Sequence, residues 1–195
     1  MKKQKYLGYF LREITIVAIG VLIAVSIGNF KEKRDNDRYI EKTLQAIEGE
    51  VRQNQSDLDT ILVRHYEMLE EIEEALEGDN SEETLGEFIA GLGGFQIVTL
   101  KNVSLRFFIS NKAELVDFDL ISQLLGIEAQ TETLSGKIER LADFAYQHIN
   151  DTDPQSKITF AFMISDVVDS EENLQESYGE FLRLNGKFLN GEEGD

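Results

Sequence analysis

The sequence predicts an all-α protein in which an N-terminal transmembrane helix continues into an elongated antiparallel helical bundle. Residues 11–30 form one long apolar stretch, and apolar residues then recur at helical spacing along three later segments. With 42% hydrophobic and 29% charged residues, the chain has the composition of a folded protein. We expect four parts: a tail at 1–10, the transmembrane helix at 11–30, an acidic bundle at 31–190 and a disordered tail at 191–195.

The stretch from residue 14 to residue 27 contains no charged side chain. Counted over residues 11–30, a helix would be roughly 30 Å long at about 1.5 Å per residue, which spans a bilayer. A cleavable signal peptide is the alternative, because the start is basic and Ala24 and Ser26 are spaced like a cleavage site. The length of the apolar run and the charged pair Arg12-Glu13 before it favour the membrane helix.

The charges that flank the apolar stretch bear on its orientation. The tail before it is almost purely cationic, whereas the side after it mixes acidic and basic residues. Short cationic tails stay on the cytoplasmic side. We therefore expect a single-pass protein in contact with membrane lipid, located in the bacterial inner membrane, with the C-terminal domain in the periplasm.

Three small residues recur at every fourth position of the apolar stretch: Gly20, Ala24 and Gly28. They fall on one face of a helix, where two backbones can approach closely, and such stripes associate helices in lipid. This face predicts a homo-oligomer or packing against a partner membrane protein. The alternative is that glycine and alanine are simply frequent in membrane helices.

The segment from Glu13 to Ala24, EITIVAIGVLIA, followed by Ile27, Asn29 and Glu32, resembles a known signature. The signature belongs to an uncharacterised family of bacterial single-pass membrane proteins with a domain of unknown function. It reads approximately G-E-I-x-L-V-x-x-G-I-L-I-A-L-x-I-N-N-W-N-E. The positions at which the chain departs from it include Arg12, Gly28, Phe30 and Lys31. The resemblance implies a membrane anchor continuing into a long charged helix, and no assigned activity.

Apolar residues in the remaining chain follow heptad spacing, which predicts three long helices. The first helix covers residues 38–77, continues from the membrane helix with little break and stops at Gly78-Asp79-Asn80. The other two have their seams at residues 120–148 and 160–188. Between them, an aspartate N-cap precedes Pro154, the only proline, at a first helical position. So short a loop makes these two helices antiparallel neighbours.

Residues 81–116 are less regular. We expect a short helix at 81–92 capped by Ser81, a break at the glycines of 91–94, and a second short helix at 99–108. Two stretches rich in β-formers could form strands instead, although the heptad spacing favours a helix for the second: 95–100 and 158–162.

Asn54 and His65 occupy seam positions that are otherwise apolar. A seam asparagine can fix the register of associating helices, but in a bundle within one chain we expect Asn54 to lie at a partly wet edge. His65 and His148 are the only histidines. A metal or proton-relay role would require them to converge with carboxylates. Without a ligand motif, we expect ordinary packed or exposed histidines.

Residues 31–195 carry a net charge of about −21, which disfavours nucleic acids and anionic lipid surfaces as ligands. Acidic residues concentrate near the end of the first long helix, where we expect a solvated face: Glu70, Glu71, Glu73, Glu74, Glu77, Asp79, Glu82 and Glu83. The chain has no cysteine and no nucleophile-elbow, phosphate-loop or calcium-loop motif. We expect no catalytic, cofactor or metal site, and no enzyme.

Two functional classes fit these features. The first is a membrane-anchored structural or accessory protein that acts through helix association with itself or with a larger membrane complex. The second is a periplasmic sensor or binding module that relays a helix shift through the membrane. With about ten residues before the span, such a signal would pass to a partner helix. A buried ligand-sized pocket would favour sensing, and a dry core would favour assembly.

Overall fold

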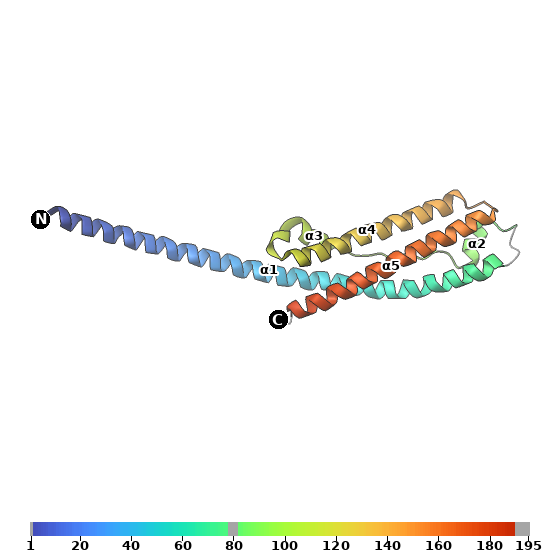
Figure 1. Ribbon diagram of the computed structural model, residues 1–195, viewed down its shortest axis with the longest axis horizontal. Coiled ribbons are helices and arrows are strands. Elements are labelled where there is room, and N and C mark those ends of the chain that lie inside the picture. Colours follow the sequence, from blue (N-terminus) through green and yellow to red (C-terminus); the bar gives the residue numbers. More distant parts are fainter. Residues whose placement is uncertain (1, 78–81, 190–195) are drawn as a thin grey trace. The chain divides into compact units, whose positions relative to one another are not determined.

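The computed structural model describes residues 2–77 and 82–189, with side chains described over 12–76 and 82–186. Every regular element in these ranges is helical, as Figure 1 shows. The all-α prediction is therefore confirmed. The predicted disordered tail at 191–195 and the predicted glycine stop at 78–80 lie outside the described residues.

The first element, α1, is one helix from Lys2 to Glu77. The predicted continuation of the apolar helix into the first heptad helix is confirmed. By compactness the chain forms two units, which divide between Lys42 and Thr43. The apolar segment belongs to the first unit and the heptad segment of α1 to the second.

The second unit contains the heptad segment of α1 with α4 (Phe118–Gln147) and α5 (Pro154–Leu189). α4 and α5 lie side by side and run antiparallel (Figure 1). α5 also runs antiparallel to α1, because hydrogen bonds join Glu48 to Asn185 and Asn54 to Tyr178. The seam side chains form the core, including these fully buried residues: Leu44, Ile47, Leu58, Met68, Leu124, Ile127, Leu134, Ile164, Leu174 and Phe181.

The last two long helices begin at aspartate caps, of which only the second was predicted. Asp117 caps α4 by accepting from the Leu120 amide at 2.8 Å. Pro154 is the first residue of α5, and Asp153 before it accepts from the Gln155 amide at 2.9 Å. A proline at this position loses no helical hydrogen bond. The predicted start of the last helix is therefore confirmed.

The first short helix begins later than the sequence suggested. α2 covers Leu85–Gly91, and its cap is Thr84, which forms a reciprocal capping box with Glu87. The predicted start at 81 is wrong because this box is the stronger start signal. Ser81 itself lies outside the described residues.

The second short helix is displaced too. α3 covers Val103–Lys112 rather than 99–108, and a short 3₁₀ helix, η1, follows at Ala113–Leu115. Residues 95–102 are neither helix nor strand. The possible strand at 158–162 is part of α5, as the heptad spacing favoured.

A tight turn at Gly93 and Gly94 leads from α2 into the irregular segment. Both glycines have positive φ, 80° and 77°, a conformation that side chains with a Cβ disfavour. The predicted break at 91–94 is confirmed. After it, the chain runs along the bundle without secondary structure from residue 95 to residue 102.

Candidate functional site

The apolar segment of α1 is exposed throughout. Between residues 14 and 30, ten large apolar side chains are 49–70% exposed. Near the N-terminus, α1 contains one segment that is long and apolar enough to cross a membrane. The most apolar part of this segment has a mean hydropathy of 2.0, and none of that part is buried. The exposure separates this segment from the buried core helix of a soluble protein, which has the same composition.

The predicted small-residue stripe lies on this exposed segment. Gly20, Ala24 and Gly28 are all exposed, and a Cβ added at either glycine would meet nothing within 4 Å. No described part of the chain covers this face. Replacing Gly20 or Gly28 by a larger apolar residue would therefore disturb no contact within the chain.

His65 is sealed in the core of the second unit. Its side chain and that of Glu171 on α5 are both 0% exposed, with His65 Nδ1 2.8 Å from Glu171 Oε2. His65 Nε2 lies 3.0 Å from the Gln96 carbonyl oxygen, and Phe95 stacks on the imidazole with ring centroids 4.6 Å apart. The expectation of a packed histidine is correct for His65, and the buried carboxylate partner was not foreseen.

The hydrogen-bond geometry fixes the number of protons that His65 and Glu171 share. The Gln96 carbonyl can only accept, so His65 Nε2 must carry a hydrogen. The short contact between Nδ1 and Glu171 Oε2 then requires one further proton, held by either the imidazole or the carboxyl group. In both arrangements the pair has no net charge. Glu171 Oε1 has no hydrogen-bond partner among the described residues.

Asn54 is also fully buried, so the expectation of a partly wet edge is wrong. Its carboxamide pairs with the backbone of Lys101 in both directions: Nδ2 donates to the carbonyl and Oδ1 accepts from the amide, each at 2.8 Å. Nδ2 also lies 3.2 Å from the Tyr178 hydroxyl on α5. Burial raises the pKa of the Tyr178 phenol, and hydrogen bonds from Thr131 and Asn54 partly oppose that rise.

These polar seam residues share one task, which is to hold the irregular segment against α1. Besides Asn54 and His65, Arg64 donates to the Leu92 carbonyl and Glu50 accepts from the Ser104 amide. Residues 95–102, which are half-buried or exposed, have no secondary structure to pair their backbone groups, and α1 supplies partners for some of them. The signal in the sequence was the polar interruption of an apolar seam next to a segment that lacks helical spacing.

The other histidine belongs to a turn. His148 Nδ1 lies 2.7 Å from Asp151 Oδ2, and Ser156 donates to the same oxygen. These hydrogen bonds, that of His148 first, lower the pKa of the Asp151 carboxyl group. The two histidines do not converge. The described residues contain no group of three or more His, Cys, Asp or Glu side chains placed to hold a metal ion.

The predicted acidic face is exposed where the structure describes it. Glu70, Glu73 and Glu74 lie in solvent. Glu71 lies 3.4 Å from Arg64, and Glu83 lies 3.4 Å from the buried Lys157. The side chains of Glu77 and Asp79 lie outside the described part of the chain. The described part of the acidic face is therefore solvated and carries two ion pairs.

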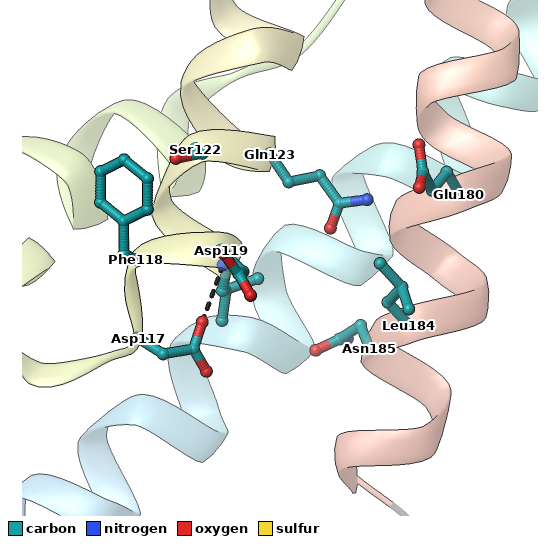
Figure 2. Close-up of a pocket in the computed structure, with 9 residues that line it drawn as sticks. Asp117, Phe118, Asp119, Ser122, Gln123, Glu180, Leu184 and Asn185 are labelled. Atoms are coloured by element: carbon teal, nitrogen blue, oxygen red, sulfur yellow. Dashed lines mark hydrogen bonds between the residues drawn. The ribbon is translucent and has the colours of Figure 1, made fainter. Parts of the chain in front are cut away.

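A surface groove of about 640 Å³ lies between the start of α4 and the end of α5. Figure 2 shows Asp117, Asp119 and Gln123 on one side and Glu180 and Asn185 on the other. The groove also has an apolar rim, formed by Phe118, 81% exposed, and Leu184, 40% exposed. Sequence reasoning singled out none of these residues as a site, because they meet only through the antiparallel packing.

Comparison with protein-family models, curated proteins and solved structures found no match. The resemblance of residues 13–32 to the uncharacterised single-pass family therefore stays a prediction from the sequence.

Proposed function

We propose that the chain is a membrane-anchored structural or accessory protein, located in the bacterial inner membrane with its bundle in the periplasm. It acts through helix association with itself or with a larger membrane complex. The observation that carries this proposal is the exposed apolar segment. Leaving ten large apolar side chains in water would forgo on the order of 10–20 kcal/mol of transfer free energy, so lipid or another helix must cover them.

The state of the core supports assembly over ligand sensing. The seams are filled by fully buried side chains, and the buried polar groups Asn54 and His65 are engaged with backbone groups of the same chain. Three cavities of about 640, 510 and 410 Å³ are each lined in part by exposed residues. A sensor of small ligands would be expected to enclose its site.

The stripe at Gly20 and Gly28 is the surface on which association is proposed. The test is the double variant Gly20→Leu with Gly28→Leu, compared with Ala18→Leu with Ser26→Leu. The second pair has the same spacing of eight residues and lies on the opposite face of the helix. Both variants keep the segment apolar, so both should insert equally.

The readout is covalent crosslinking in native membranes followed by mass measurement of the crosslinked species. We expect the wild type and the Ala18/Ser26 variant to give the same crosslinked species, and the Gly20/Gly28 variant to lose it. Leucine at the glycine positions prevents close backbone approach. Recovery of uncrosslinked monomer from the wild type, or equal crosslinking in all three proteins, would refute the proposal.

A further inference from the structure

Asn185, in the wall of the groove between α4 and α5, has an unsatisfied acceptor. Its side chain is 2% exposed, and its Nδ2 donates to Glu48 Oε2 on α1 at 3.1 Å. A carboxylate only accepts, so the amide nitrogen must face Glu48 and the amide oxygen must face away. That oxygen has no partner among the described residues, and Figure 2 shows it directed across the groove toward the start of α4.

The rest of the groove also presents acceptors. Asp117, Asp119 and Glu180 stand around it, and the nine lining residues include no lysine or arginine. Arg183 approaches Glu180 only to 4.0 Å, and both side chains are 60% exposed. Exposed pairs of this kind are weak and leave the carboxylate open to a better donor.

The apolar rim limits the chemistry of the ligand that this groove can bind. Phe118 and Leu184 offer exposed apolar surface beside the carboxylates. A planar guanidinium donates several hydrogen bonds at once and stacks on an aromatic ring, which a simple metal ion does not do. Phe118 is 81% exposed, so its ring is open to contact with a partner.

We propose that this groove binds an arginine side chain carried on an apolar segment of a partner protein. The guanidinium donates to the exposed carboxylates of Asp119 and Glu180, and a small shift of the buried Asn185 side chain lets its Oδ1 accept as well, while the apolar neighbours of the arginine pack on Phe118 and Leu184. The proposal rests on the proposed function and deepens it by naming the partner's chemistry. Charge complementarity with the acidic bundle is the argument for this occupant.

The test uses the peptide acetyl-Leu-Arg-Leu-amide and the full chain in detergent micelles. Binding is followed by the NMR shifts of backbone amides at 117–123 and 180–185 and of the Asn185 side chain. We expect saturable shifts with this peptide and none with the analogue that carries neutral citrulline in place of arginine. The citrulline peptide preserves the size of the side chain but replaces one NH2 donor group by a carbonyl oxygen, so the comparison tests the positive charge together with the full set of donors.

Two matched variants locate the site. Asp119→Asn with Glu180→Gln removes two exposed carboxylates at the groove, and Glu139→Gln with Asp143→Asn removes two exposed carboxylates elsewhere on α4. Loss of charge-assisted hydrogen bonds should weaken peptide binding about tenfold in the first variant only.

The groove proposal is overturned by the absence of saturable shifts, by equal binding of the citrulline peptide, or by equal weakening in both variants. Shifts confined to residues 12–30 would also overturn it, since they would report contact with the apolar segment. None of these outcomes depends on the crosslinking result at Gly20 and Gly28. Failure of the groove and failure of membrane association are therefore distinguishable.

Discussion

Two buried side chains, Asn54 and His65, illustrate what a polar residue at a seam position does in this protein. Each satisfies backbone groups of the segment after α2, and neither reaches solvent. A buried polar side chain without a partner costs about 1–3 kcal/mol, so the need of Asn54 and His65 for partners selects one placement of a segment that has no regular hydrogen bonds of its own. The sequence marked both residues as exceptions without naming their partners.

The proton between His65 and Glu171 gives a residue-scale prediction. Glu171→Gln keeps a donor toward His65 Nδ1, so the free energy of unfolding should change by less than about 1 kcal/mol. Glu171→Leu leaves Nδ1 buried without a partner and should lower it by about 1–3 kcal/mol. Urea unfolding of the full chain in mild detergent, followed by circular dichroism, measures both.

The control for this pair is Glu176→Leu, an exposed position on α5, where we expect a change within about 0.5 kcal/mol. If Glu171→Gln were as damaging as Glu171→Leu, a hydrogen-bond donor toward His65 Nδ1 would not replace the carboxyl group. That result would contradict the expectation that this hydrogen bond accounts for the contribution of Glu171 to stability.

At the scale of elements, α2 is held to the turn between α4 and α5 by close backbone contact. The amides of Leu85 and Gly86 donate to the carbonyls of Asp151 and Ile149, both at 2.8 Å. A Cβ at Gly86 would lie 2.7 Å from Ile149 Cγ1 and 2.9 Å from Ile149 O. Glycine is therefore required at this crossing, whereas Gly91 in the same helix has open space.

We predict that Gly86→Ala lowers the free energy of unfolding by about 1–3 kcal/mol, since the carbonyl at Ile149 cannot move without breaking its hydrogen bond. Gly91→Ala should be neutral or stabilising by up to about 1 kcal/mol. Hydrogen exchange of the α2 amides in the full chain reads the local effect. Similar protection in Gly86→Ala and the wild type would show that α2 does not dock as described.

The same turn gives a prediction about pH. Hydrogen bonds from His148 and Ser156 lower the pKa of Asp151 below its usual 3.8. A carboxyl group with a lowered pKa in the folded state contributes stability above its unfolded value, and that contribution is lost as the pH falls through the folded value. Asp151→Asn should therefore be less stable than the wild type at about pH 6, and the gap should close well below pH 3.8.

Urea midpoints at several pH values measure this gap, with the exposed Asp143→Asn as the control that should show none. A gap that persists unchanged at low pH would mean that Asp151 acts through its shape alone. The carboxylate would then have no part in holding the turn.

For the molecule as a whole, periodic apolar spacing was enough to predict three long helices. The aspartate before Pro154 predicted the start of the last helix, and the uncharged run at 14–27 predicted the apolar segment. Apolar spacing does not predict the structure of a segment whose backbone groups form hydrogen bonds with another element. The shift of the second short helix to Val103–Lys112 follows from this, because residues 95–102 are fixed by Asn54 and His65 at long range. The groove could not be predicted from the spacing either, since it joins residues some sixty positions apart.

The account depends on the apolar residues near 11–30 remaining attached and dissolved in lipid. The direct measurement is an alkaline carbonate wash of native membranes followed by intact mass determination of the protein in the pellet and in the supernatant. We predict that the protein stays in the pellet with the mass of the whole chain, 22.2 kDa. A shortened protein beginning at Ile27, found in the supernatant, would contradict the account and identify residues 1–26 as a cleaved signal peptide.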